Sequence, residues 1–205
     1  MKGGTTASPR LVVVGGINGC GKSTLASVAG PDVFLGQTAI NPDDLTREVV
    51  DSFPELDGQA ANLIGVERAE KAVWRAIAEG ENVAVETVLS SEKFVPAVRA
   101  ARARGYQTRL IYIGLPSAEL AIERVAQRVQ LGGHDVPEGK IRSRWERTHD
   151  MLTQMLSEVD DVIVFSNGGL APILVGERLG ADSPFRLYLP GELPEITNRL
   201  GLGDT

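Results

Sequence analysis

A cluster of glycine, basic and hydroxyl residues near the N-terminus has the types and spacing needed to hold a phosphate group. Gly16, Gly21, Lys22 and Ser23, with Thr24 next to them, match the pattern G-x-x-x-x-G-K-S/T. Glycines allow backbone angles that a Cβ would forbid, so amide N–H groups can turn toward phosphate oxygens. The lysine adds a mobile positive charge, and the first hydroxyl can ligate Mg²⁺. The pattern therefore predicts a loop that binds ATP with magnesium.

The flanking residues complete this predicted nucleotide-binding loop. A short apolar run over residues 11–15 precedes it, and a helix is expected to begin near Lys22, with its N-terminus facing the phosphates. Cys20 occupies a place that needs a small side chain, and we interpret it as a spacer without a redox role. The predicted nucleotide-binding residues of the loop are Gly16, Asn18, Gly19, Cys20, Gly21, Lys22, Ser23 and Thr24.

Two acidic segments follow apolar runs that we expect to form strands. Asp43 and Asp44 follow the expected strand over residues 33–40. Glu86 lies near the end of the expected strand over residues 82–88. Ligands of parallel sheets bind at the carboxyl ends of the strands, where a carboxylate can orient and deprotonate a substrate hydroxyl. We therefore predict that Asp43 is the catalytic base, with Asp44 as the next candidate, and that Glu86 contacts the substrate or metal-bound water.

Each acidic residue also has an ordinary structural explanation. Asp is a favoured N-cap residue, so Asp43 or Asp44 could cap the next helix. Glu86 could accept hydrogen bonds from backbone amides, because a buried carboxylate is costly unless it is paired. A polar turn that contains Thr87 and Ser90 follows this glutamate. The predicted substrate-binding residues are Asp43, Glu86, Thr87 and Ser90.

A basic segment over residues 124–147 has the composition expected of a lid that closes over a phosphate group. Arg124 and Arg128 are four residues apart, so they share one face of a helix. Arginines delivered by closure would neutralise charge on the transferring phosphoryl group, and we assign this pair to that role. The alternative is a solvated helical hairpin.

The second half of this lid segment leaves more room for interpretation. His134 lies in a glycine turn, and we group it with the nucleotide-binding residues, although it could simply pack within the turn. For the arginines that begin the following helix, lid and solvent roles stay equally open. These residues are Arg142, Arg144 and Arg147.

The elements that must position these residues alternate between strands and helices. Apolar runs predict strands over residues 11–15, 33–40, 82–88, 107–114, 161–166 and 173–179. Helical periodicity lies between them, with Gly80 as a stop signal and Ser117 as an N-cap. This alternation predicts an α/β three-layer P-loop NTPase fold, with a mostly parallel sheet of about five or six strands, helices on both faces and a small helical lid. We expect a single domain over residues 1–205, with a C-terminal tail, 182–205, of unknown role.

Composition limits the partners and the location of the protein. The chain has 205 residues, a net charge of −6 and one cysteine, which excludes an internal disulfide. An acidic chain has no broad electrostatic reason to bind nucleic acid. No stretch approaches the roughly 18 apolar residues of a membrane span, and the N-terminus lacks a secretory apolar core. We expect a cytoplasmic protein with neither nucleic acid nor membrane as a partner.

The chain lacks motifs that would assign the loop to other nucleotide-using classes. No Asn-Lys-x-Asp motif is present, which disfavours a GTPase, and no Leu-Ser-Gly-Gly motif, which disfavours a transporter-type ATPase. Few aromatic residues and the negative charge disfavour a polynucleotide 5′-kinase. The remaining hypotheses are a kinase of a small hydroxyl substrate (a nucleotide sugar, sugar, antibiotic or nucleoside) and a regulatory ATPase switch without an acceptor.

Taken in order, these segments resemble the zeta-toxin-like P-loop kinase family. The match runs from about Leu11 to Gly169. Beyond the loop, the matching segments are Asn41-Pro-Asp43, Glu86-Thr-Val-Leu-Ser90, Leu115-Pro-Ser, Ile122-Glu-Arg124-Val and Gly132-Gly-His134-Asp-Val-Pro137. The later segments are more distinctive than the loop itself.

The resemblance implies a magnesium-dependent kinase that uses ATP. The better-studied toxins of the family phosphorylate the 3′-hydroxyl of UDP-N-acetylglucosamine, so a nucleotide sugar is the implied acceptor. The resemblance also implies site roles, with Lys22 on the phosphates, Ser23 on magnesium, Asp43 as base and Glu86 near the substrate or metal.

For the lid, the resemblance implies that Arg124 acts on the phosphoryl group together with a second cation. That second cation aligns with His134 or is replaced by Arg128. Toxins of the family are restrained by an antitoxin that blocks the nucleotide site. The implied protein partner is therefore a separate antitoxin chain.

Overall fold

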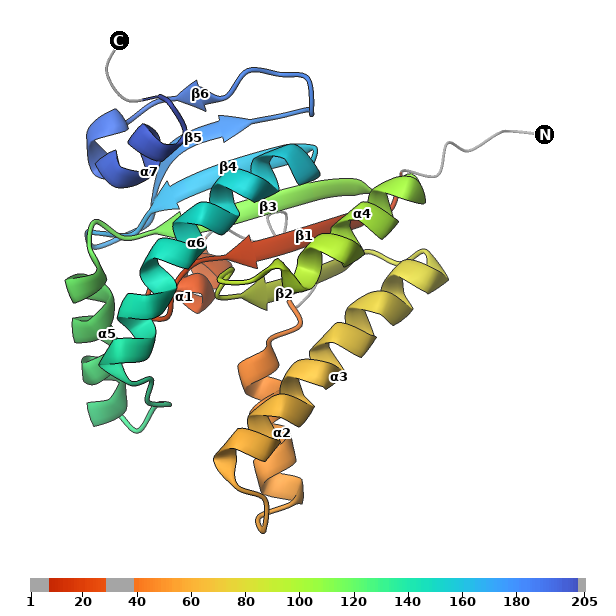
Figure 1. Ribbon diagram of the computed structural model, residues 1–205, viewed down its shortest axis with the longest axis vertical. Coiled ribbons are helices and arrows are strands. Elements are labelled where there is room, and N and C mark those ends of the chain that lie inside the picture. Colours follow the sequence, from red (N-terminus) through yellow and green to blue (C-terminus); the bar gives the residue numbers. More distant parts are fainter. Residues whose placement is uncertain (1–7, 29–38, 203–205) are drawn as a thin grey trace.

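The computed structural model describes residues 8–28 and 39–202 and is built around one six-stranded sheet in the order β2-β1-β3-β4-β5-β6 (Figure 1). β1 pairs in parallel with β2 and β3, and β3 pairs in parallel with β4. β5 and β6 extend the sheet antiparallel. The prediction of a mostly parallel α/β sheet is therefore confirmed. The strands are β1 (Arg10–Gly15), β2 (Val83–Thr87), β3 (Gln107–Gly114), β4 (Asp161–Ser166), β5 (Ile173–Arg178) and β6 (Arg186–Leu187).

Most of the strand predicted over residues 33–40 lies outside the described residues. Its end is described, and there Ile40 forms a parallel bridge with Val85 of β2. The Ile40 amide donates to the Ala84 carbonyl at 2.8 Å, and the Glu86 amide donates to the Ile40 carbonyl at 2.9 Å. This pairing brings the residues just after Ile40 to the carboxyl end of the sheet.

Helices cover both faces of the sheet, as predicted. In Figure 1, α3, α4 and α6 lie in front of the strands and α1 lies behind them. No helix among the described residues is both long and apolar enough to cross a bilayer. The helices are α1 (Lys22–Val28), α2 (Pro42–Ser52), α3 (Gly58–Glu79), α4 (Val95–Ala103), α5 (Ala118–Gln130), α6 (Glu138–Glu158) and α7 (Pro194–Arg199), with 3₁₀ turns at Glu92–Phe94 and Pro190–Glu192.

Strand β1 shows why its apolar run is continuous. Leu11 and Val13 join a core cluster with α3, α4 and the C-terminal half of α6. Val12 and Val14 join a second cluster with α1, α5 and the N-terminal half of α6. Because successive side chains of a strand point to opposite faces, a strand buried on both faces has no polar alternation.

The helix boundaries follow local signals. Gly80 ends α3 in the left-handed region, with φ of 75°. The Ser117 side chain accepts a hydrogen bond from the Leu120 amide at 3.2 Å and caps α5. Both of these predictions are confirmed. The alternative in which Asp43 or Asp44 caps α2 is excluded, because Asn41 is the N-cap and its Oδ1 accepts from the Asp43 amide at 2.9 Å. Asp43 and Asp44 therefore lie in the first turn of α2, and their side chains are free of capping.

Helices α2 and α3 form a hairpin that projects away from the sheet (Figure 1). A Cβ at Gly65 of α3 would meet Thr46 of α2, with Oγ1 at 2.3 Å and the backbone amide nitrogen at 2.6 Å. Only glycine therefore permits this close approach of the two helices. The hairpin holds the start of α2, and with it Asp43, beside the end of β2.

Candidate active site

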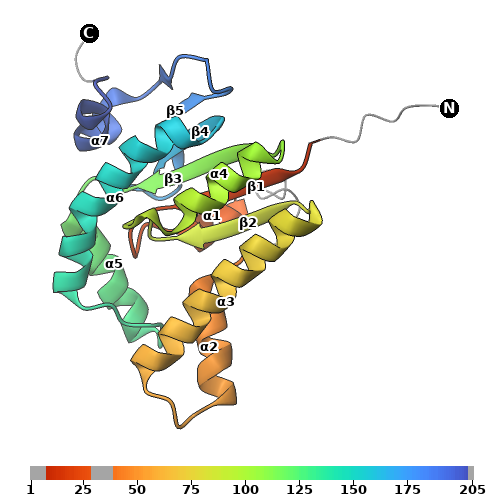
Figure 2. The same ribbon diagram turned by 45° about the vertical axis from the view of Figure 1, so that its right-hand side comes forward.

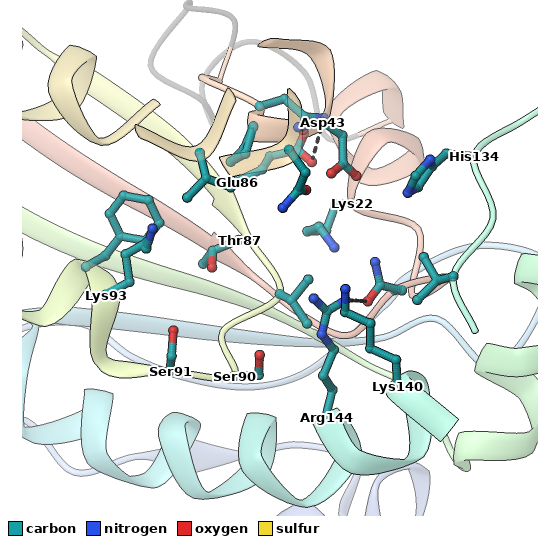
Figure 3. Close-up of a pocket in the computed structure, with 18 of the residues that line it drawn as sticks. Lys22, Asp43, Glu86, Thr87, Ser90, Ser91, Lys93, His134, Lys140 and Arg144 are labelled. Atoms are coloured by element: carbon teal, nitrogen blue, oxygen red, sulfur yellow. Dashed lines mark hydrogen bonds between the residues drawn. The ribbon is translucent and has the colours of Figure 1, made fainter. Parts of the chain in front are cut away.

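A cavity of about 280 Å³ opens at the carboxyl ends of β1 and β2 (Figure 3). Its wall combines the glycine loop, the start of α2, the side of α3, the turn after β2 and the segment 134–144. Figure 3 shows Lys22 between two acidic residues, Asp43 and Glu86, and the cations of α6. Seven residues predicted from the sequence line this cavity: Asn18, Lys22, Asp43, Glu86, Thr87, Ser90 and His134.

The glycine loop has the backbone conformation that its pattern predicts. Gly16, Gly19 and Gly21 have φ of 151°, 81° and 90°, in a region that side chains rarely adopt. A Cβ at Gly16 would also meet the Ile113 carbonyl oxygen at 2.5 Å. Just after β4, the side-chain amide of Asn167 donates to the Cys20 carbonyl at 2.8 Å and so stabilises the loop.

Lys22 is turned toward its own loop. Its Nζ donates to the Gly16 carbonyl at 2.8 Å and lies 3.9 Å from the Cys20 sulfur. A bound phosphate would offer this ammonium stronger, charged acceptors. Cys20 is fully buried, and burial raises the pKa of its thiol. That environment fits a spacer better than a reactive thiol.

Ser23 and Thr24 lie in the first turn of α1 with exposed side chains. Among the described residues, no group of three or more His, Cys, Asp or Glu is arranged to hold a metal ion. Mg²⁺ bound with ATP usually takes one or two protein ligands and completes its shell with phosphate oxygens and water. The Ser23 hydroxyl at the helix N-terminus fits that small donor set.

Glu86 is a buried carboxylate at the end of β2, with 8% of its surface exposed. The side-chain amide of Asn41 donates to Glu86 Oε2 at 3.4 Å. In the described structure, the partner of Glu86 is therefore a side chain and not the backbone amides of the following loop. Burial raises the pKa of Glu86, Lys22 opposes the shift, and Asp44 and Asp43 reinforce it. Asn41 was not predicted as a site residue, yet it links the cap of α2 to this carboxylate.

Asp43 and Asp44 point in different directions. Asp43 lines the cavity across from the α6 cations (Figure 3). Asp44 is more than half exposed and forms an ion pair with Arg47 on the same helix. The position of Asp43 is the one that suits a base acting on a bound hydroxyl.

The turn after β2 forms the far wall of the cavity. Thr87 Oγ1 accepts from the Leu89 amide at 3.1 Å, and Leu89 adopts a left-handed conformation with φ of 56°. Such a conformation is uncommon for a branched residue and marks a tightly determined turn. Ser90 lines the cavity beside two residues that the sequence did not single out, Lys93 and Phe94.

Neither arginine of the predicted lid pair lines the cavity. Arg124 is half-buried, and its Nη2 donates to the Gly169 carbonyl at 3.4 Å, beyond the end of β4. Arg128 donates to the His134 carbonyl at 2.7 Å and so holds the glycine turn in place. His134 itself lines the cavity (Figure 3).

The cation that does reach the loop is Arg144 of α6. Its Nη1 donates to Asn18 Oδ1 at 2.7 Å. Burial lowers the pKa of this guanidinium, Arg147 lowers it further and Asp43 opposes the shift, but an arginine stays charged in a protein. Lys140 also lines the cavity. The sequence contained a signal for this pair, since residues four apart share a helix face.

The other arginines of α6 have partners outside the cavity. Arg142 pairs with Glu119 and Glu138. Arg147 donates to the Ser143 carbonyl of its own helix at 2.9 Å. The structure therefore separates three arginines that the sequence could not rank.

Comparison with solved structures shows the fold. The chain of the AvrRxo1-ORF1:-ORF2 complex with ATP superposes with a TM-score of 0.68 at 17% identity, covering 97% of this chain and 64% of that one. This protein thus spans less than two thirds of that relative's length. The PezAT chromosomal toxin-antitoxin system of Streptococcus pneumoniae gives 0.62 at 14% identity, covering 80% of this chain and 70% of that one.

Comparison of sequences shows the family. An uncharacterized protein of Haemophilus influenzae is 28% identical over 130 residues, which is 63% of this chain and 88% of that protein. The Zeta toxin family model matches residues 3–174, a range that includes the glycine loop, both acidic segments and the segment 124–147. By that match over most of its length, this chain, with its three-layer P-loop fold, belongs to the Zeta toxin family.

Proposed function

We propose that this protein transfers the γ-phosphoryl group of ATP, bound with Mg²⁺, to a hydroxyl of a small molecule. The main support is one cavity in which Lys22, Asp43 and Arg144 converge. Phosphoryl transfer needs phosphate binding, a group that accepts the proton of the attacking hydroxyl and cations that neutralise charge on the transferring group. The wall of this cavity supplies all three kinds of side chain.

The nucleotide would bind at the loop side of the cavity. Backbone amides of the glycine loop and the N-terminus of α1 would hold the phosphates, and Lys22 would leave the Gly16 carbonyl for the β- and γ-phosphates. Ser23 would be the protein ligand of Mg²⁺, which would supply positive charge to offset that of the phosphates. ATP as the donor also fits the cytoplasmic location expected from the sequence.

The acceptor would bind between Asp43 and the turn after β2. Asp43 would take the proton from the attacking hydroxyl, and Glu86, with its raised pKa, would hold the substrate by hydrogen bonding. Thr87 and Ser90 would contact the rest of the acceptor. We assign the phosphoryl-neutralising role to Arg144, because Arg124 and Arg128 lie outside the cavity lining.

A nucleotide sugar such as UDP-N-acetylglucosamine is the proposed acceptor, since the zeta-type kinases act on it. The polar turn at Ser90, the Lys93 ammonium and the Phe94 ring offer partners for hydroxyl, anionic and ring groups. Another small hydroxyl substrate (a sugar, antibiotic or nucleoside) is the alternative within the same class. A regulatory ATPase switch would need no acceptor, and the polar far wall would then have no ligand.

The test is incubation of the purified protein with Mg²⁺-ATP and UDP-N-acetylglucosamine, followed by mass spectrometry. We expect a phosphorylated nucleotide sugar from the wild type and none from Lys22→Ala, with the fold retained. Lys71→Ala is the matched control, because Lys71 is an exposed lysine of α3 away from the cavity. A wild-type rate in Lys22→Ala would overturn the loop assignment. No product with this acceptor or with the other small hydroxyl compounds would overturn the kinase proposal.

A separate antitoxin is the proposed protein partner. Membership of the Zeta toxin family and the likeness to the PezAT toxin-antitoxin system support it. Expression of the chain alone should arrest growth of a bacterial host, and Lys22→Ala should not. Normal growth with active enzyme would mean that this chain needs no antitoxin.

A further inference from the structure

The C-terminal tail, whose role the sequence left open, is packed into the core. It lies beyond the part of the chain that the family model matches. Leu193 and Ile196 are buried, each with 2% of its surface exposed. A Cβ at Gly114 would meet Leu193 Cδ1 at 2.6 Å, so the tail closes directly over the end of β3. Figure 2 shows α7 beside helix α6.

Glu195 of α7 contacts one face of α6 at two places. Its Oε2 accepts a hydrogen bond from the Trp145 indole Nε1 at 3.1 Å. Its Oε1 lies 3.4 Å from His149 Nδ1. Trp145 and His149 are four residues apart, and their rings pack edge to face with centroids 4.6 Å apart. The Glu195 carboxylate therefore contacts two packed aromatic side chains, Trp145 and His149, which lie one turn apart on α6.

The neighbouring face of α6 contacts the segments that form the cavity wall, namely the glycine loop and the turn after β2. Arg144 donates to Asn18 in the glycine loop at 2.7 Å. Thr148 donates to the Val88 carbonyl in the turn after β2 at 2.6 Å. Each of these residues directly precedes a residue that Glu195 contacts. Because one residue turns an α-helix by about 100°, the grip of Glu195 fixes the rotation that aims Arg144 and Thr148.

A second clamp from the tail acts on the outer side of α6. Arg199 of α7 forms ion pairs with Glu146 and Asp150, again four residues apart. Arg199 also lies 3.7 Å from Glu195, which links the two clamps. Exposed ion pairs contribute little to stability by themselves. Their arrangement along one helix suits alignment of that helix better than it suits holding the fold together.

We propose that Glu195 is a positioning residue for phosphoryl transfer, which acts by holding α6 so that Arg144 points at the glycine loop. This inference rests on the proposed kinase function. It assigns to the tail a role in the alignment of the cation Arg144. Glu195 acts through its hydrogen bond with the Trp145 indole.

A double-mutant cycle tests this inference. When Arg144 is present, Glu195→Ala should lower both kcat and the affinity for a non-hydrolysable ATP analogue. The two losses multiplied together should come to about tenfold. In the Arg144→Ala background, the same change should alter them less than twofold, because the cation it positions is already gone. Trp145→Phe, which removes the indole donor and keeps the ring, should reproduce the effect of Glu195→Ala. Glu195→Gln should retain most activity, since its amide oxygen can still accept from the indole.

Glu177→Ala is the matched control. It removes another C-terminal carboxylate that accepts from an aromatic side chain, the Tyr188 hydroxyl at 2.9 Å, but it does not touch α6. An equal loss from Glu195→Ala with and without Arg144 would overturn the inference, and so would unchanged parameters in Trp145→Phe. Analogue affinity needs no acceptor, so the cycle still gives an answer if the wild type phosphorylates nothing. Confirmed transfer with an additive cycle would overturn the positioning role alone.

Discussion

The two helical arms that border the cavity are joined to the core in different ways. Within the described residues of α2, Val49 alone is fully buried, and the hairpin reaches the core mainly through the C-terminal half of α3. Helix α6 has buried residues along its length, from Ile141 to Met155, and contributes to both core clusters. The carboxylate Asp43 therefore lies on a hairpin that is fixed at one end, and the cation Arg144 lies on a helix that both core clusters and α7 hold in place. Figure 1 shows the hairpin and α6.

This difference suggests how the cavity divides its work. A displacement of α2 breaks few buried contacts, whereas a displacement of α6 would open the core on both faces of the sheet. The nucleotide side is thus rigid, and the acceptor side is the one that can adjust. We expect substitutions on α6 to affect ATP and transfer together, and substitutions on the hairpin to affect transfer with ATP binding retained.

Arg144→Ala should have the largest effect on this comparison. Loss of the cation nearest the loop should lower transfer by about 10³, the lower end for arginines that neutralise a transferring phosphoryl group elsewhere. The affinity for ATP should fall as well, which calorimetry would measure. Arg142→Ala is the control, because Arg142 pairs with Glu119 and Glu138 outside the cavity. Equal rates in the two variants would show that Arg144 does not supply the cation.

Asp43→Asn should come next and should separate the two arms. Transfer should fall by about 10² while ATP affinity stays within a few-fold of the wild type, since the side chain acts on the acceptor. Asp44→Asn, which affects an exposed ion pair with Arg47, should be close to wild type. If Asp43→Asn were fully active, the base would have to be sought elsewhere, with Asp44 first.

Gly65→Ala tests how the hairpin aims Asp43. The new Cβ would overlap Thr46, so α2 must shift, and we expect transfer to fall by roughly tenfold, because small misplacements of a reacting group are costly. Stability should fall by about 1–3 kcal/mol, the usual cost of overpacking. Gly58→Ala, at the start of the same helix with nothing described within 4 Å, is the control. A fully active Gly65→Ala enzyme would mean that the position of α2 is not critical.

Substitution of His149 should have the smallest effect of these changes. It should alter the pH dependence of stability and not phosphoryl transfer. Burial lowers the pKa of His149, Glu195 and Glu146 oppose the shift, and Arg199 reinforces it. The unfolded chain then binds a proton more readily than the folded one, so the free energy of unfolding should fall as pH drops below about 6.5. Denaturant titrations at pH 7.5 and 5.5 should show a smaller fall in the free energy of unfolding for His149→Gln than for the wild type. The same pH dependence in both proteins would exclude His149 as its source.

The sequence predicted those parts of the molecule that depend on local pattern. The glycine loop, the strand before it, the Gly80 stop and the Ser117 cap each follow from residues within one or two turns of one another. Asp43, Glu86 and Ser90 could also be placed at the cavity, because the carboxyl ends of parallel strands converge.

The remaining site residues depend on contacts between distant segments. Arg144 meets Asn18 across 126 residues. The helix pattern places Lys140 and Arg144 on one face, but it does not show that this face meets the glycine loop. The tail gives no periodic signal, because its two clamps on α6 come from the single short helix α7. The cap at Asn41 could not be told from the sequence, because Asn and Asp are about equally favoured N-cap residues and Asp43 and Asp44 lie two and three residues further on.

The most direct test of phosphoryl transfer is ADP release by the wild-type protein with Mg²⁺-ATP, measured with and without small hydroxyl acceptors, starting with UDP-N-acetylglucosamine. A kinase should release ADP at least tenfold faster with its acceptor than with water alone, and Asp43→Asn should abolish that stimulation. The same slow release with every acceptor as without one would contradict the kinase account and would favour a nucleotide-dependent switch.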